Sequence, residues 1–163
     1  MAAASSITYI YFWKPNQRNG YLSNWYNSPF IVDGKYFLNN EQYFMWRKQQ
    51  LFDSRNTRLE NEILETSDPN RIKQLGRSVK NFDESIWDIH KYDIMKTGLT
   101  HKFIQNIELK TELIKTKDAY LVEASPYDKI WGIGLNMDDA KHKEWRGENL
   151  LGKALMDVRQ TIN

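Results

Sequence analysis

The feature that most constrains the fold of this chain is an unbroken run of β-branched and aromatic residues near its start, Ile7–Trp13. Such a run is typical of a buried strand, and the polar Lys14-Pro15 pair ends it. The rest of the chain has mostly helical spacing, with no alternation of strand and helix that would build a parallel sheet. The sequence therefore predicts one α+β domain, rich in helix with a few short strands, over residues 7–162, with a flexible N-terminus at residues 1–6.

A hairpin and a series of helices are predicted after this strand. Asp33-Gly34 separates two short apolar runs, which is a good hairpin signal. Asn39 or Asn40 is expected to cap a helix, and Asp68 is expected to cap another that begins with Pro69. The expected helices span residues 41–52, 57–64, 69–76, 84–97 with an extension to 107, 108–116 and 149–162, and a further strand is expected at 121–124.

The composition excludes several classes of function. The chain has no cysteine, which excludes disulfide scaffolds, thiolate zinc sites and cysteine nucleophiles. Its 23 basic and 21 acidic residues leave a formal charge of +2, whereas proteins held to nucleic acid mainly by phosphates are normally much more basic. No apolar run approaches the roughly 18 residues of a membrane span, and Thr8, Lys14 and Asn16 interrupt any signal peptide. We therefore expect a cytoplasmic protein with no membrane partner.

One predicted helix carries an acid and an amine on the same face. Glu41 and Lys48 are seven residues apart, so they lie two turns apart and roughly 20° out of line. Tyr43 to Trp46 between them are aromatic or apolar, which predicts that most of this helix is buried. Buried charges need partners or a purpose, although an ordinary surface arrangement explains the spacing equally well.

Two further segments contain candidate binding residues. Asp128 and Trp131 lie in an irregular stretch between a predicted strand and the last helix, and loops held by a rigid scaffold concentrate binding groups. A structural turn explains the glycines of this stretch equally well. Arg77 follows Gly76 at the end of a short helix, where it can bind a phosphate or carboxylate bidentately or cap the helix end.

The sequence gives no sign of a metal or cofactor. Its three histidines, His90, His101 and His142, lack the spacing of metal ligands. No nucleophile elbow, Walker loop or Ser-His-Asp order is present. We therefore expect neither a metal site nor a cofactor.

Short motifs stand in a consistent order along nearly the whole chain, from about residue 7 to residue 159. They are Phe12-Trp13, Leu22–Tyr26, Asp33-Gly34, Asn40–Phe44, Lys48, Leu75–Arg77, Phe82-Asp83, Trp87, Met95, Leu99, Lys102-Phe103, Leu121–Gly134, Trp145–Gly147 and Asn149–Gly152. The block Ser125–Gly134 is the most specific of them. Together they resemble the NADAR, or YbiA-like, N-glycosidases.

This resemblance implies a helix-rich α+β fold that cleaves the C–N bond between a base and a ribose. Two substrate classes are associated with the family: early phosphoribosylamino-pyrimidine intermediates of riboflavin biosynthesis, and ADP-ribose attached to guanine. The expected partner is thus a small ribosyl-phosphate or ADP-ribosyl substrate, or an ADP-ribosylated nucleic acid. The implied catalytic residues are Glu41, Lys48 and Asp128. The implied substrate-binding residues are Trp87 and Trp131, and we expect Arg77, Asn24 and Tyr43 to bind substrate as well.

Three aromatic residues depart from the family pattern. Trp46 stands where a small residue is expected, and Trp13 and Trp25 replace the commoner Tyr and Phe. Such enlarged side chains predict a narrower pocket. They affect the expected substrate rather than the chemistry.

The chemistry that the resemblance implies builds positive charge on the ribose ring. Glu41 and Asp128 form a suitable carboxylate pair, in which one stabilises the ring or activates water and the other protonates the leaving base. Lys48 offers a second route, because a desolvated amine can attack the anomeric carbon and form a Schiff base. The alternative function is a module that binds ADP-ribose or an NAD-type nucleotide without cutting it. Such a module has no need of Glu41 and Lys48 on one helical face.

Overall fold

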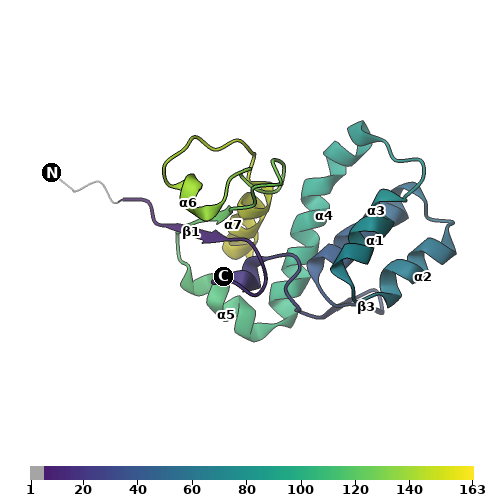
Figure 1. Ribbon diagram of the computed structural model, residues 1–163. Coiled ribbons are helices and arrows are strands. Elements are labelled where there is room, and N and C mark those ends of the chain that lie inside the picture. Colours follow the sequence, from purple (N-terminus) through teal and green to yellow (C-terminus); the bar gives the residue numbers. More distant parts are fainter. Residues whose placement is uncertain (1–5) are drawn as a thin grey trace. The chain divides into compact units, whose positions relative to one another are not determined.

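The computed structural model describes residues 6–163 (Figure 1). Most of the expected flexible N-terminus, residues 1–5, lies outside the described residues. The contacts of the chain divide it into two compact units. Unit 1 takes the chain up to Ser23 together with Glu108–Asn163, and unit 2 is Asn24–Ile107. The predicted fold class, helix-rich α+β with short strands, is confirmed.

Unit 1 is built around two parallel strands. β1 (Tyr9–Phe12) pairs with β4 (Tyr120–Glu123), and α7 (Leu150–Ile162) packs against β4. α5 (Ile107–Lys115) leads into β4, and the short helices η1 (Gly20–Leu22) and α6 (Met137–Ala140) complete the described elements of this unit. The prediction of a buried first strand is wrong in its extent. Tyr9 is 44% exposed and only Phe12 is fully buried, because a two-stranded sheet covers little of either strand.

One hydrophobic cluster of unit 1 includes Val122 of β4 and extends along the chain that follows this strand. Small and aliphatic side chains form it, namely Val122, Ala124, Ile133, Leu135 and Ala140. Trp145 packs against them, and its Nε1 donates a hydrogen bond to the carbonyl of Ala140 (2.9 Å). α6 was not predicted from the sequence because four residues are too few to show helical periodicity. It begins at Asn136, whose side chain accepts from the N–H of Asp139 (2.8 Å).

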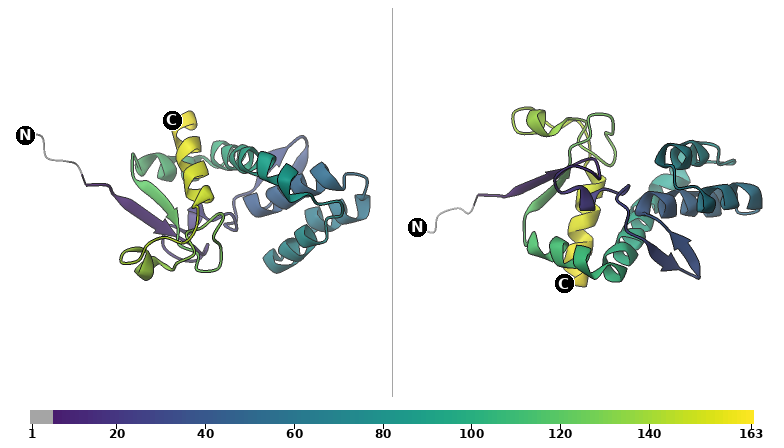
Figure 2. Two further views of the ribbon diagram at one scale, coloured as in Figure 1. Left: turned by 90° about the horizontal axis from the view of Figure 1, so that it is seen from above. Right: turned by 60° about the horizontal axis from the view of Figure 1, so that its bottom comes forward.

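Unit 2 is a group of helices with a hairpin beside it (Figures 1 and 2). α1 (Asn40–Phe52) packs against α2 (Thr57–Glu65), α3 (Pro69–Arg77) and α4 (Glu84–Gln105). The predicted hairpin is confirmed as β2 (Phe30–Val32) and β3 (Lys35–Phe37). Its turn residues Asp33 and Gly34 both have positive φ, 51° and 76°, as the tight hairpin turn requires.

Side-chain caps fix where the helices of unit 2 begin. Asn39 accepts from the N–H of Gln42 (2.9 Å), which decides between the two predicted caps of α1. Asp68 accepts from the N–H of Asn70 (3.0 Å), as predicted for α3. The Gln42 side chain also donates to the carbonyl of Ile63 (2.9 Å), so the first turn of α1 is tied to α2. None of the helices within residues 6–163 has the length and apolar character needed to cross a membrane.

Candidate active site

Buried amide side chains hold the first turn of α1, which carries Glu41. The carbonyl of Asn24 accepts a hydrogen bond from the Glu41 N–H (3.1 Å), and its Oδ1 accepts from the Asn40 Nδ2 (2.9 Å). Both amides also donate to the sulfur of Met95 on α4, at 3.4 and 3.2 Å. Asn24 is only 7% exposed. Its side chain therefore fixes the start of α1 against α4, and the substrate contact predicted for it from the sequence stays a prediction.

Two helical turns after Glu41, the Lys48 amine lies in a partly buried site. Its Nζ donates to the carbonyl of Gly76 (2.9 Å) and lies 4.5 Å from the centre of the Phe82 ring. Burial lowers the pKa of Lys48; the Glu41 carboxylate raises this pKa, and the Arg77 guanidinium lowers it. The amine thus loses its proton more readily than an ordinary lysine. This is the property that a nucleophile or a proton acceptor requires.

The structure therefore brings two predicted residues, Glu41 and Arg77, within electrostatic reach of the Lys48 amine. α1 supplies Glu41 and Lys48, because both lie on one helix that runs without a break from Asn40 to Phe52. α3 supplies Arg77 in its exposed last turn, where a cation also complements the negative end of the helix dipole. An acid, an amine of lowered pKa and a guanidinium thus occupy one side of unit 2.

The Trp87 ring packs among other aromatic rings, so little of its face is open for a substrate base to stack on. Its ring centre lies 5.0 Å from that of Phe44, 6.3 Å from Phe52 and 6.5 Å from Phe82. The side chain is 9% exposed. The sequence predicted that Trp87 stacks on a base or shapes the pocket, and packing this deep suits the shaping role.

Tyr43 lies in the core of unit 2. It is 1% exposed, and its ring packs against Phe37 (5.2 Å) and Trp46 (6.1 Å). Its hydroxyl accepts from the Arg47 guanidinium (2.6 Å), and burial raises the pKa of Tyr43. These contacts give Tyr43 a role in core packing, and the substrate contact predicted for it stays a prediction.

The large Trp46 side chain does not narrow the site either. Its ring packs against Phe37 (5.3 Å), and its Nε1 donates to a carboxylate oxygen of Glu60 on α2 (3.3 Å). Five helical residues turn the chain by roughly 500°, which points Trp46 away from Glu41. Its volume therefore fills the space between α1 and the neighbouring elements. The other two enlarged residues, Trp13 and Trp25, are half-buried.

Asp128 and Trp131 belong to unit 1, where a hydrogen-bonded loop carries them. The Asp128 Oδ1 accepts from the backbone N–H groups of Ile130 (2.9 Å) and Trp131 (2.8 Å), which forms an Asx turn. The carbonyl of Trp131 accepts from the N–H of Leu151 (3.1 Å), at the start of α7. Both residues thus have fixed positions. Asp128 also uses one carboxylate oxygen to shape its own loop.

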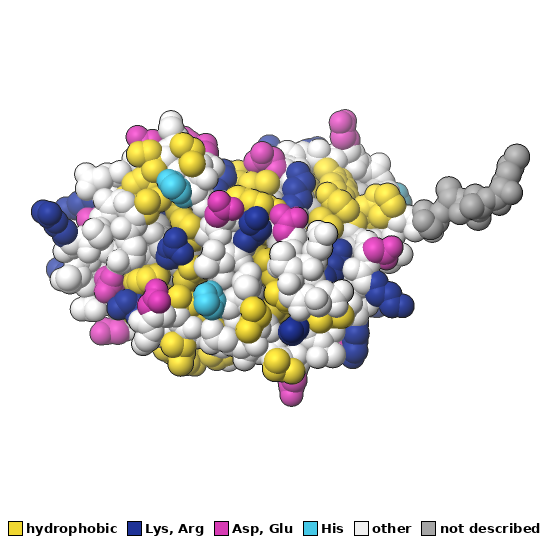
Figure 3. Space-filling view, turned by 180° about the vertical axis from the view of Figure 1, so that it is seen from behind, with side chains coloured by type: hydrophobic (Ala, Val, Ile, Leu, Met, Phe, Trp, Pro, Cys, Tyr) yellow, Lys and Arg dark blue, Asp and Glu magenta, His cyan; other side chains and the backbone are white. Residues whose placement is uncertain are grey.

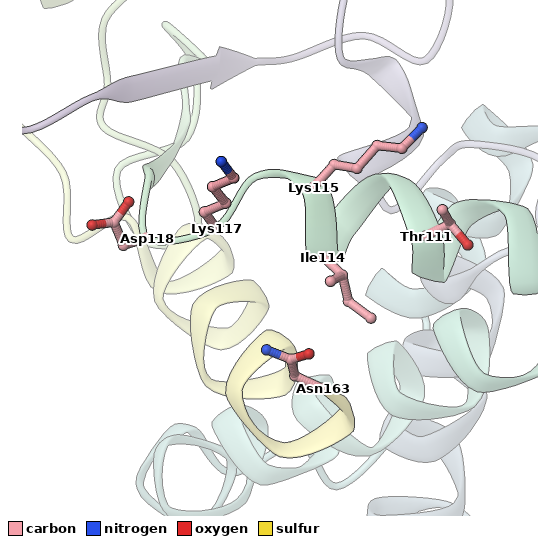
Figure 4. Close-up of a pocket in the computed structure, with 6 residues that line it drawn as sticks. All are labelled: Thr111, Ile114, Lys115, Lys117, Asp118 and Asn163. Carbon is pink, nitrogen blue, oxygen red and sulfur yellow. The ribbon is translucent and has the colours of Figure 1, made fainter.

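The hollow drawn in Figure 4 contains none of the predicted residues. It measures about 780 Å³ and lies in unit 1 between α5 and the end of α7. Its lining is Thr111, Ile114, Lys115, Lys117, Asp118 and Asn163. Ile114 points toward the end of α7, whereas the Lys115 amine points away (Figure 4). With one acid and no aromatic side chain, this hollow lacks the groups that the predicted chemistry needs.

Charge is distributed evenly over the face shown in Figure 3. Lysine, arginine and acidic side chains alternate there with neutral and apolar surface. The basic side chains visible there stand singly or in small groups, with acidic side chains between them. Within residues 6–163, no group of three or more histidine, cysteine or acidic residues could hold a metal ion.

The sequence did not predict two partners of the Lys48 amine. One is the carbonyl of Gly76, and a backbone carbonyl carries no sequence signal. The other is Phe82, which the chain segment between α3 and α4 brings beside α1. Phe82 belongs to one of the family motifs, but its spacing does not show that it lies beside Lys48.

Comparison with known proteins gives consistent matches along the chain. The sequence matches the NADAR domain over residues 11–163. It is 40% identical to the protein named N-glycosidase R617 of Acanthamoeba polyphaga mimivirus, over 93% of this chain and 95% of that protein. It is 30% identical to Riboflavin biosynthesis protein VVA0006 of Vibrio vulnificus (strain YJ016), over 94% of this chain and 38% of that protein. The NMR structure of the E. coli protein YbiA matches with a TM-score of 0.79 at 30% identity, covering 98% of this chain and 87% of that one.

Proposed function

The chain belongs to the NADAR domain family and is an N-glycosidase, and on this basis we propose that it hydrolyses the C–N bond between a pyrimidine amine and ribose phosphate. The observation that carries the proposal is the Lys48 amine, held by the carbonyl of Gly76 beside Glu41 and Arg77. A nucleophile, a carboxylate and a phosphate-binding cation are the groups that this reaction uses. The name of the Vibrio relative supports an early intermediate of riboflavin biosynthesis as the substrate.

In the proposed route, the neutral Lys48 amine attacks the anomeric carbon of the ribose. The bond from that carbon to the base nitrogen breaks, and the base leaves with a proton. The sugar ring opens to a Schiff base, and water then adds to this Schiff base and releases ribose phosphate and the free amine. Glu41 takes a proton from the attacking amine and passes it to the leaving base, and it later takes a proton from the water that attacks the Schiff base. Arg77 binds the phosphate through its planar guanidinium.

A direct hydrolysis is the competing route. Here the Glu41 carboxylate activates a water molecule and stabilises the charge that develops on the ribose ring. The sequence pairs Glu41 with Asp128 without deciding which of the two protonates the leaving base, and a catalytic role for Asp128 remains a prediction. The two routes differ in whether a covalent bond to Lys48 forms, so they can be separated chemically.

The first experiment identifies the substrate. Purified protein without added metal is incubated separately with the phosphoribosylamino-pyrimidine intermediate and with a guanine-ADP-ribosylated oligonucleotide, and released base and sugar are followed by mass spectrometry. We expect cleavage of the first substrate, and at least about a hundredfold slower cleavage by Glu41→Gln, which is the usual scale for one acid–base group. Cleavage of the oligonucleotide alone would replace the proposed substrate with ADP-ribosyl guanine. Cleavage of neither substrate would refute both.

The second experiment tests the covalent route. Sodium borohydride is added during turnover, which reduces a Schiff base to a stable secondary amine. We expect the peptide that contains Lys48 to gain the mass of the reduced sugar phosphate. Lys48→Arg keeps the positive charge but has no nucleophilic amine, and it should show neither the adduct nor turnover. Full turnover by Lys48→Arg would leave direct hydrolysis as the route.

A further inference from the structure

The Phe82 side chain contacts both α1 and α4 of unit 2. It directly precedes Asp83, whose side chain caps α4 by accepting from the N–H of Ile86 (3.1 Å). Its ring packs edge-on against Trp87 in the first turns of α4 (6.5 Å between ring centres). An apolar residue before the cap that packs on the fourth helical residue is a hydrophobic staple, which fixes how the chain enters a helix.

The same ring also packs on α1. Its centre lies 5.3 Å from that of Phe52, again in an edge-on arrangement. The Lys48 Nζ lies 4.5 Å from the centre of the ring and 2.9 Å from the carbonyl of Gly76. Phe82 is 44% exposed, so this ring stands between the amine and part of the surrounding solvent. A staple alone does not require contact with a lysine amine.

We propose that Phe82 is the positioning residue of Lys48, whose ring covers one side of the amine and keeps the Nζ against the carbonyl of Gly76. The proposal rests on the proposed function in taking Lys48 to be the reacting group. An aromatic ring suits both tasks, because its face attracts the ammonium form while its bulk excludes water. The staple and the packing on Phe52 hold the ring still, which a mobile surface side chain could not achieve.

The charged groups around the amine are Glu41 on the same helix and Arg77 on α3. They oppose each other, since Glu41 favours the ammonium form and Arg77 disfavours it. Neither is removed when Phe82 is changed. A change in the titration of Lys48 in a Phe82 variant therefore reports the loss of the aromatic cover.

The test measures the amine directly and needs no substrate. The folded protein is labelled with a trace of acetic anhydride at a series of pH values, and mass spectrometry of the Lys48 peptide gives the pKa of the amine. The variants are Phe82→Ala, which removes the cover, and Phe82→Leu, which keeps an apolar cover and an apolar staple. Ile86→Ala is the matched control, because Ile86 is 43% exposed and lies in the first turn of the same helix.

We expect the pKa of Lys48 to rise toward that of an ordinary lysine in Phe82→Ala, because burial is the largest influence on this pKa and water then reaches the amine. This effect outweighs the lost attraction of the ring face for the ammonium form, which alone would lower the pKa. It should stay at or below the wild-type value in Phe82→Leu, and at the wild-type value in Ile86→Ala. Turnover by Phe82→Ala should fall on the order of tenfold with little change in KM, as expected when a reacting group is misplaced. The basic shift of its pH–rate profile should match the shift found by labelling.

An unchanged or lowered pKa in Phe82→Ala would overturn the proposal and leave Phe82 as a staple, whose loss lowers thermal stability without moving the titration. A raised pKa together with full activity of Lys48→Arg would refute the catalytic role of Lys48 and still support its positioning by Phe82. The labelling and the activity measurements therefore separate failure of this inference from failure of the proposed function.

Discussion

Gly98 on α4 is the position where one added methyl group should most disturb the start of α1. A Cβ placed there would meet the Asn40 Oδ1 and stand 2.6 Å from the Cδ1 of Tyr43. Neither neighbour can move cheaply, because Asn40 is 0% exposed and hydrogen-bonded to Asn24, and Tyr43 is 1% exposed. Gly98→Ala therefore forces the first turn of α1 away from α4.

The free-energy change follows from three contributions. Overpacking a filled core costs about 1–3 kcal/mol, and the upper part of that range applies where both neighbours are fixed. Losing the Asn40–Asn24 hydrogen bond costs about 1 kcal/mol more. Replacing a glycine inside a helix by alanine returns about 1 kcal/mol. The net expectation is a loss of about 2–3 kcal/mol in the free energy of unfolding, or roughly 4–12 °C in Tm for a chain of this length.

Gly76→Ala on α3 is the matched comparison. There the Cβ would meet the Sδ of Met45 and stand 3.1 Å from its Cγ. Methionine is flexible and adapts to such a change, so this variant should lose less than about 1 kcal/mol after the helix gain of alanine. Urea unfolding of both variants measures the difference. Equal stabilities of Gly98→Ala and Gly76→Ala would refute the reasoning that the rigidity of the neighbour sets the cost.

Three further predictions concern other parts of the fold. Gln105→Ala should cost about 1 kcal/mol and speed amide exchange in the hairpin, because the Gln105 amide bonds both the N–H and the carbonyl of Ile31 (2.8 Å each); unchanged exchange would contradict this. Burial raises the pKa of Tyr21 from 10.0 to about 12, so the folded state holds the proton longer and stability should fall as the pH rises between these values. Tyr21→Phe should flatten that fall in urea midpoints. Asp128→Asn should keep the stability of the wild type, since an amide oxygen can still accept both N–H groups, whereas Asp128→Ala should lose about 1 kcal/mol; equal melting of the two variants would exclude a structural role for the Asx turn.

The local signals in the sequence predicted most helix boundaries of unit 2. Asn39 and Asp68 act through hydrogen bonds to backbone groups two or three residues away, so their effect is readable without the rest of the fold. The hairpin was predicted for the same reason, since Asp33-Gly34 sets its turn alone. The burial of the first strand was not predictable in this way. It depends on how many strands pair with it, and among the strands of residues 6–163 only β4 pairs with β1.

The candidate site shows where periodicity stops being informative. Helical spacing placed Glu41 and Lys48 on one face of α1, but it could not tell which neighbours that face would meet. The structure supplies the Gly76 carbonyl and the Phe82 ring from α3 and the segment that follows it. The same spacing left Tyr43 as a candidate for substrate contact. The sequence alone does not distinguish an aromatic residue that lines a site from one that fills the core.

A residue that belongs to a family motif can therefore contribute to activity in two ways: by contacting the substrate, or by holding other parts of the site in place. The Asn24 side chain holds the Asn40 side chain at the start of α1, and the Asp128 side chain holds the backbone of its own loop. Substituting either by alanine removes these hydrogen bonds, so activity would fall even if neither side chain met the substrate. Loss of activity in an alanine variant is thus ambiguous at these positions. A variant that keeps the oxygen acceptor and changes only the charge, as Asp128→Asn does, separates the two contributions when stability and turnover are measured on the same protein.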